Sequence, residues 1–241
     1  MENTLNEKIL NLEANLKIVR ERMAEAAVKS GRKPEDITLL AATKTVSTEL
    51  INKAIEFGLT HMGENKVQEL MDKYDNLNLE NCSCQFIGHL QTNKVKYLIG
   101  KVDLIQSVDS FKLAKEISRL SEKQGIVTDI LLEVNIGREE NKSGVMPEKL
   151  DELFEEVSSL SGVNVKGLMC IPPICENKEE LMGYFSRMND YFVDIKRKKL
   201  DNKNDSMILS MGMSSDYYEA ILCGATMVRV GSLLFGERIY K

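Results

Sequence analysis

The sequence repeats one pattern along most of its length: a short apolar run, a polar turn and an amphipathic helical stretch. Short apolar runs alternating with helical stretches indicate buried parallel strands joined by crossover helices. We count eight such units, with strands predicted at Ile37–Ala42, Thr60–Gly63, Gln85–Gly88, Leu104–Ser107, Asp129–Val134, Lys166–Ile171, Met207–Ser210 and Met227–Val230. Helices predicted between them include Thr48–Phe57, Asn65–Tyr74, Ser110–Gln124, Glu148–Leu160 and Lys178–Lys199.

Eight βα units in 241 residues match a closed (β/α)₈ TIM barrel of the α/β class better than an open sheet. An open doubly wound sheet is the competing fold, but neither GxGxxG nor GxxxxGK[ST] follows the first strand. An extra amphipathic helix, Leu5–Ser30, precedes that strand. We expect residues 1–241 to form a single domain, with the helix of residues 1–30 packing on the barrel. The polar run Lys198–Ser206 is predicted to be a surface loop.

The composition favours a small ligand in a reducing compartment. The 32 basic and 37 acidic residues are interspersed and give a net charge of −5, so no basic face indicates nucleic acid or an anionic membrane. Neither a membrane-spanning apolar stretch nor a signal peptide is visible, so we expect a cytoplasmic protein. The odd number of cysteines without paired spacing predicts reduced, mostly buried thiols and no metal site. They are Cys82, Cys84, Cys170, Cys175 and Cys223.

Polar and small residues follow several predicted strands directly. In a barrel these positions line the active site, because the carboxyl ends of all strands meet at one mouth. They are Thr43-Lys44, Glu64-Asn65, His89, Asn135, Ser210 to Ser214 and Arg229 to Ser232.

Lys44 is the sharpest candidate among these residues. Partial desolvation beside an apolar run lowers a lysine pKa and favours the neutral amine that a Schiff base requires. Position alone nevertheless favours an ordinary solvent-exposed lysine, because long basic side chains readily reach water from strand ends.

The last two strands supply the counterpart of Lys44. Ser210 to Ser214 leads into a helix predicted to begin near Ser215, and such a turn beside a helix N-terminus can hold a phosphate. Gly231 permits close backbone approach on the adjoining wall. A lysine and a phosphate cup at one mouth suit pyridoxal 5′-phosphate (PLP). Arg229 would then face the pyridine nitrogen and leave it unprotonated, which favours Schiff-base formation over carbanion stabilisation.

Several motifs occur in one order from about Ile37 to the C-terminus. They are Ala42-Thr43-Lys44, Gly63-Glu64-Asn65, Gln68-Glu69, Phe86-Ile87-Gly88, Leu90 to Lys94, Lys142-Ser143-Gly144, Gly167-Leu168-Met169, Ser210 to Ser214, Arg229-Val230-Gly231 and Phe235-Gly236. In these the chain resembles the YggS/PROSC family of PLP homeostasis proteins, whose barrel is related to the N-terminal domain of alanine racemase. Two departures leave local contacts open: Lys66 stands where the family has Tyr, and Cys84-Gln85 where it has Trp-His.

The resemblance implies a role for each site residue. Lys44 would carry the cofactor as an aldimine, Arg229 would face the ring nitrogen, and Asn65 and Met211 would line the pocket. The phosphate would be held by Ser210, Gly231 and Ser232.

Two functions follow from this site. The first is a carrier that buffers PLP without robust turnover and passes it to apoenzymes or free amino acids. The alternative is a PLP-dependent amino-acid racemase, but the chain ends at Lys241, so we expect no C-terminal β domain to bring the second catalytic base. General acid–base catalysis is typically worth ~10²–10⁴-fold, so without the second base we expect at best slow racemisation and assign no catalytic residue. Because the β domain also forms the usual dimer contact of the racemases, we expect a monomer.

Three further residues have less specific interpretations. We read His61 and His89 as structural or rim histidines, and Glu64 as a hydrogen-bonding wall residue.

Overall fold

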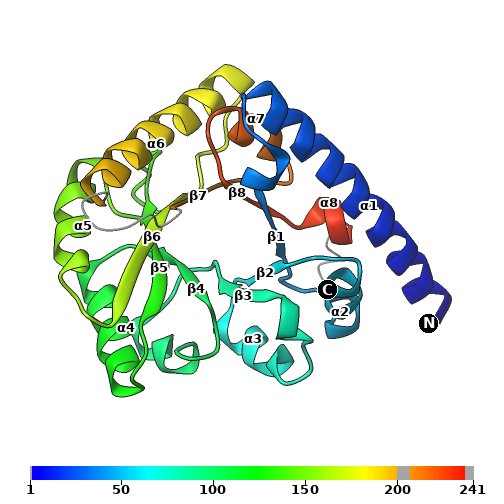
Figure 1. The fold of residues 1–241 in the computed structure, drawn as a ribbon, viewed down its shortest axis with the longest axis horizontal. Coiled ribbons are helices and arrows are strands. Elements are labelled where there is room, and N and C mark those ends of the chain that lie inside the picture. The colour runs from blue at the N-terminus through cyan, green and yellow to red at the C-terminus, as the bar shows by residue number, and fades with distance from the viewer. Residues whose placement is uncertain (1, 200–206, 237–241) are drawn as a thin grey trace.

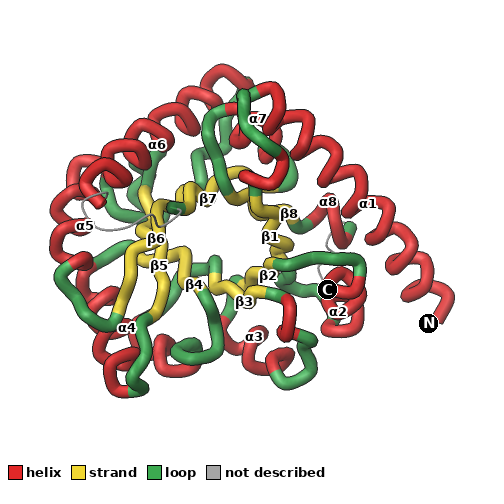
Figure 2. The backbone as a smooth tube through the Cα atoms, viewed as in Figure 1, coloured by secondary structure: helices red, strands yellow, loops and turns green. Residues whose placement is uncertain are grey.

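Parallel strands close into a barrel in the computed structural model, which describes residues 2–199 and 207–236 (Figures 1 and 2). The eight strands of these residues follow one another around the barrel in chain order, and the last pairs with the first. The predicted closed barrel is therefore confirmed, and the open sheet is wrong. The strands are β1 (Thr38–Ala42), β2 (His61–Glu64), β3 (Ser83–Phe86), β4 (Leu104–Val108), β5 (Thr128–Val134), β6 (Val163–Cys170), β7 (Ile208–Met213) and β8 (Met227–Val230).

Two strands differ from prediction in ways that matter for the site. β3 ends at Phe86 rather than at Gly88. Gly88 lies in a close loop contact, where an added Cβ would lie 2.0 Å from the backbone oxygen of Asn65. β7 continues to Met213, past its predicted end at Ser210. Its glycine, Gly212, lies in a bulge with φ +92° rather than in a turn. The predicted loop from Ser210 is therefore mostly strand.

Helices surround the barrel (Figure 1). They are α1 (Glu2–Lys29), α2 (Thr48–Glu56), α3 (Val67–Tyr74), α4 (Phe111–Lys123), α5 (Leu150–Ser158), α6 (Lys178–Lys199), α7 (Tyr217–Leu222) and α8 (Ser232–Phe235). Between β3 and β4 the connection is a 3₁₀ helix, Thr92–Tyr97. Lys198 and Lys199 end α6, so this part of the predicted surface loop is helical, and the rest lies outside the described residues.

The expected N-terminal helix forms α1, and its apolar stripe is buried. Leu12, Leu16, Val19 and Met23 are each at most 5% exposed. α1 lies along α7 and α8 rather than within the ring of crossover helices, which ties the start of the chain to its last βα units (Figure 1). This packing stabilises the helix more than its intrinsic propensity does.

The barrel interior changes character along its axis. Apolar residues fill one level in two small clusters, one around Leu40 and Met227 and the other around Leu131 and Met169. Toward the carboxyl ends of the strands the buried residues become polar. They are Gln85, Gln106, Glu133, Ser210 and Arg229. A polar interior at this end favours a ligand site at the mouth above it.

The five cysteines are free thiols, and Cys82, Cys84 and Cys170 are buried, as the reduced-thiol prediction requires. Over residues 2–199 and 207–236, no helix combines the length and apolar character needed to cross a membrane.

Candidate functional site

Lys44 lies just beyond the carboxyl end of β1 and is half-buried. Side chains alternate along a strand, and Leu40 and Ala42 belong to the interior cluster, so the same alternation places Lys44 on the interior side at the mouth. Thr43, between them, is fully buried and its backbone N–H donates to Gly63 on β2. Lys44 therefore lies at the mouth of the barrel, at the predicted position.

Thr45, the residue after Lys44, has a left-handed backbone conformation, which threonine rarely adopts. Thr45 has φ +64°, in the left-handed region, where a β-branched side chain is strained. The Oε1 atom of Glu69 accepts a hydrogen bond from the Thr45 N–H at 2.5 Å, and the same atom pairs with Lys73 at 2.6 Å. The α3 helix thus holds the turn that directs the chain away after Lys44.

Glu64 completes this support and is hydrogen-bonded as predicted, but its partners Thr43 and Lys73 lie between the strands and α3. Its Oε1 atom accepts hydrogen bonds from the Thr43 hydroxyl and the Lys73 ammonium, both at 2.8 Å. Burial raises the Glu64 pKa, while these two partners oppose the rise. A buried acid held by a lysine and a hydroxyl fixes structure, because both partners stabilise one carboxylate geometry.

A buried hydrogen-bond network forms the floor beneath the mouth. One guanidinium nitrogen of Arg229 donates to the Ser210 hydroxyl at 2.7 Å, and the other donates to the backbone oxygen of Cys170 at 2.9 Å. Ser210 donates onward to Gln106 at 2.7 Å, and Gln106 donates to Gln85 at 2.6 Å. Burial lowers the Arg229 pKa, but an arginine in such a network stays charged. The floor therefore presents a fixed cation.

At the predicted phosphate cup, a hydrogen bond joins the loop after β7 to the end of β8. The Ser214 hydroxyl accepts hydrogen bonds from the backbone N–H groups of Gly231 at 3.0 Å and Leu233 at 3.5 Å. Ser210 is fully buried and bound to Arg229, so its role as a phosphate ligand stays a prediction. Gly231 packs against β1, where an added Cβ would lie 3.2 Å from the backbone oxygen of Ala42. Ser232 is exposed beside it.

The helix after β7, α7, begins later than predicted and has an acidic residue at its N-terminus. It starts at Tyr217 rather than near Ser215, and the Asp216 carboxylate accepts the backbone N–H of Met213 at 2.6 Å. Asp216 is only 8% exposed, and a buried carboxylate here would repel a phosphate. The anion site expected at this helix N-terminus stays a prediction, and Asp216 occupies the position next to it.

The two other predicted pocket residues lie in different surroundings. Asn65 is half-buried at the end of β2, and its side-chain Oδ1 has no hydrogen-bond partner among the described residues. Met211 is fully buried and its side chain belongs to the large cluster between strands and helices. Its side chain therefore does not line the barrel interior, and only its backbone could contact a ligand in the predicted pocket.

The rim is formed by the loop after β5. The ring nitrogen Nδ1 of His89 lies 3.2 Å from the Ser143 hydroxyl, which makes His89 an exposed rim residue. Asn135 holds the loop by donating to the backbone oxygens of Glu139 and Lys142. Lys66 is exposed ahead of α3, whereas Cys84 is buried on β3 with a pKa raised by burial to about 12.

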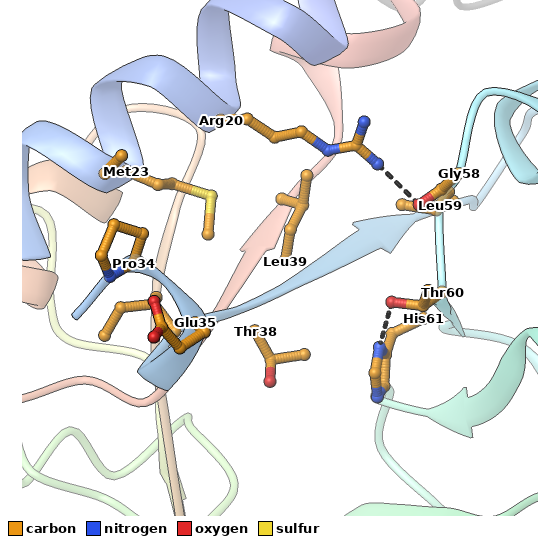
Figure 3. A pocket seen from close by; sticks show the side chains of 12 residues that line it. Arg20, Met23, Pro34, Glu35, Thr38, Leu39, Gly58, Leu59, Thr60 and His61 are labelled. Carbon is orange, nitrogen blue, oxygen red and sulfur yellow. Dashed lines mark hydrogen bonds between the residues drawn. The ribbon is translucent and has the colours of Figure 1, made fainter.

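A separate cleft of about 460 Å³ lies near the start of β1, at the opposite end of the barrel (Figure 3). Arg20 of α1 donates there to the backbone oxygens of Phe57 at 3.2 Å and Gly58 at 2.6 Å. His61 bonds the Thr60 hydroxyl, and burial lowers its pKa. Arg20 therefore secures the end of α2, and His61 is a structural residue as predicted. In residues 2–199 and 207–236, no His, Cys, Asp and Glu side chains gather in a way that could hold a metal ion.

Comparison with known proteins places this site in a family. Residues 9–239 match the alanine racemase N-terminal domain family. A relative from Aquifex aeolicus, a pyridoxal phosphate homeostasis protein, is 47% identical over 96% of this chain and 100% of its own length. This chain belongs to the pyridoxal phosphate homeostasis protein family. The resemblance stated from the motifs is thereby confirmed.

Solved structures extend the comparison of this family. PipY of Synechococcus elongatus, with PLP bound, has a TM-score of 0.77 and 31% identity, over 89% of this chain and 100% of PipY. An alanine racemase of Clostridium difficile has a TM-score of 0.73 at 15% identity, over 95% of this chain and 57% of the racemase. The racemase therefore shares the fold, and the sequence kinship lies with the homeostasis proteins.

Proposed function

We propose that this chain binds PLP at the mouth of the barrel and takes part in PLP homeostasis by carrying or buffering the cofactor. The observation that supports this most directly is the pairing of β1 with β8, with Ala41 opposite Val230. That register sets Gly231 beside Ala42, two residues before Lys44, so the amine and a cradle of backbone N–H groups lie at the carboxyl ends of two adjacent strands. The bound PLP in PipY, a relative of the same family, agrees with it.

The residues present fit a phosphorylated pyridine aldehyde. Gly231 has no side chain, and a Cβ there would crowd Ala42. The backbone N–H of Gly231 points at an acceptor, the Ser214 hydroxyl. Arg229 offers donors beneath, and the Asn65 Oδ1 is a polar atom without a partner among the described residues. A ligand that satisfies buried polar groups gains affinity, because such groups are costly when left unpaired.

Each residue then has a defined part. PLP supplies an aldehyde that condenses reversibly with primary amines. Lys44 supplies the amine of the protein, Gly231, Ser232 and Ser214 hold the phosphate, and Arg229 donates to the ring nitrogen. An arginine cannot accept the ring proton, so the site favours holding the cofactor over the carbanion chemistry of a racemase.

We further propose that residues 1–241 form one PLP-binding domain that acts as a monomer in the cytoplasm, where its free thiols would stay reduced. Recipients would be amines that compete with Lys44: free amino acids or the active-site lysines of apoenzymes.

The test is capture of PLP at a single lysine. The full chain is incubated with PLP, reduced with borohydride and mapped by mass spectrometry. We expect the pyridoxyl group on Lys44 and its loss in Lys44→Ala, whereas Lys53→Ala, which alters an exposed lysine of α2, should behave as wild type. A wild-type protein that stays colourless with excess PLP would contradict the proposal. Repeated conversion of an L-amino acid to its D form would instead favour the racemase.

A further inference from the structure

Glu133 is a buried acid on the interior side of β5 that the site described above does not use. Its side chain is 7% exposed, and its Oε2 atom accepts no hydrogen bond from the described residues. Burial raises its pKa to about 7, the nearby Asp109 adds to the rise, and Arg229 opposes it. Buried carboxylate oxygens without a donor are rare in folded proteins, because the ionised form loses its hydration.

The strand register brings Glu133 into the field of Arg229. On β6, Cys170 pairs with Val134 of β5, next to Glu133. The guanidinium of Arg229 reaches across from β8 and donates to the Cys170 backbone oxygen at 2.9 Å. Glu133 in turn raises the Arg229 pKa, so each side chain responds to the charge of the other. No ion pair within 4.0 Å joins the two in the described part of the chain.

We propose that Glu133 is a positioning residue for bound PLP: its change between the neutral and the ionised form sets how strongly Arg229 engages the pyridine ring, so that PLP is held more tightly when Glu133 is protonated. This inference rests on the proposed function. It adds to the hydrogen-bond network beneath the mouth a titratable group, Glu133, that controls how tightly PLP is held.

The direction follows from charge. With a neutral Glu133, the Arg229 cation is uncompensated on that side and its donors are available to the ring. An ionised Glu133 compensates the charge of the guanidinium and adds a negative charge near a phosphorylated ligand, which is itself anionic. Two charges in a partly buried site interact strongly enough to change a dissociation constant by about tenfold.

The other charged groups around Glu133 do not supply this switch. Asp109, just after β4, raises the Glu133 pKa. The Cys170 thiol on β6 has a pKa raised by burial to about 12 and stays neutral. Arg229 on β8 stays a cation, with Asp216 as a further negative charge near it.

The test compares PLP affinity of the full chain across pH. Dissociation constants are measured from about pH 6 to about pH 8.5 for wild type, Glu133→Gln and Asp129→Asn. Asp129 is a matched control on the same strand, where it accepts a hydrogen bond from Asn164 at 2.7 Å. We expect the wild-type constant to rise about tenfold more than that of Glu133→Gln over this range, and Asp129→Asn to follow wild type.

Equal pH dependence in wild type and Glu133→Gln would overturn the inference, as would a loss of affinity in Glu133→Gln that is the same at every pH. A second measurement needs neither PLP nor the variant: carbon-13 NMR of the glutamate carboxyls in the ligand-free wild type should show one that titrates near pH 7. Absence of that titration sinks the inference alone. Absence of PLP binding in wild type sinks the proposed function instead.

Discussion

The Ser214 hydroxyl accepts the backbone N–H of Gly231 at 3.0 Å and so joins the loop after β7 to the end of β8. A backbone N–H that already binds a hydroxyl oxygen is positioned to bind a phosphate oxygen, because both are acceptors at similar distances. This contact, rather than the more deeply buried Ser210, marks the expected phosphate position.

Ser214→Ala should therefore weaken binding of PLP more than binding of pyridoxal, which lacks the phosphate. A hydrogen bond to a charged group is worth roughly 1.5–3 kcal/mol, which corresponds to a tenfold or larger loss of PLP affinity. Fluorescence titration with both ligands measures the ratio. Ser210→Ala serves as the contrast, because Ser210 bonds Arg229 and Gln106. An equal loss for PLP and pyridoxal in Ser214→Ala would remove Ser214 from the cup.

Arg229→Gln should change the absorption spectrum of the bound cofactor and destabilise the barrel. The substitution removes two charge-assisted hydrogen bonds, to Ser210 and to the backbone of Cys170. Losses of this kind in a buried network cost about 2–4 kcal/mol. Absorption spectroscopy with PLP and urea unfolding without PLP separate the two effects. A spectrum identical to that of wild type would place the ring away from Arg229.

Thr45→Gly should stabilise the ligand-free protein relative to Thr45→Ala. Thr45 has φ +64°, and a left-handed conformation costs residues other than glycine about 1–2 kcal/mol. Part of that gain is offset by the greater freedom of glycine in the unfolded chain, so we expect a difference of about 1 kcal/mol. Thermal unfolding of the two variants measures it. Equal stability would mean that residue 45 is not left-handed in solution.

Glu133 should make the unfolding free energy depend on pH even without PLP. Its pKa is raised from 4.5 in the unfolded chain to about 7 in the folded one, so the folded state binds the extra proton. Stability is therefore full below about pH 4.5, falls as pH rises toward 7 and then stays low. The slope is at most about 1.4 kcal/mol per pH unit. Glu133→Gln should lack this component, and the difference between the two urea-unfolding profiles measures it. A pH-independent difference would contradict it.

The fold was predictable because each apolar run has a strong period and a clear end. Met227–Val230 matched its predicted bounds, since Gly224 and Gly231 punctuate it on either side. β7 was misread because a glycine in a polar stretch usually marks a turn. Here Gly212 instead permits close packing of α7, where an added Cβ would lie 2.5 Å from the Cβ of Ala220.

Within the site, position at a strand end could be predicted, but hydrogen-bond partners could not. Lys44, Arg229 and Gly231 stand where strand order places them. Ser210 and Ser214 are both hydroxyls in one segment, and the sequence does not reveal that Ser210 bonds Arg229 whereas Ser214 bonds the N–H of Gly231. The link from Glu69 to Thr45 joins residues 24 positions apart through the packing of α3, a tertiary contact without a local sequence pattern.

The seam between β1 and β8 has a consequence for synthesis on the ribosome. The amine at Lys44 emerges early, whereas Gly231 and Arg229 emerge near the end, and they meet only when the last strand docks on the first. If PLP binds both strands as proposed, a nascent chain would not hold it until the barrel is complete. A ligand that binds both β1 and β8 would stabilise the closed barrel relative to any partly open form.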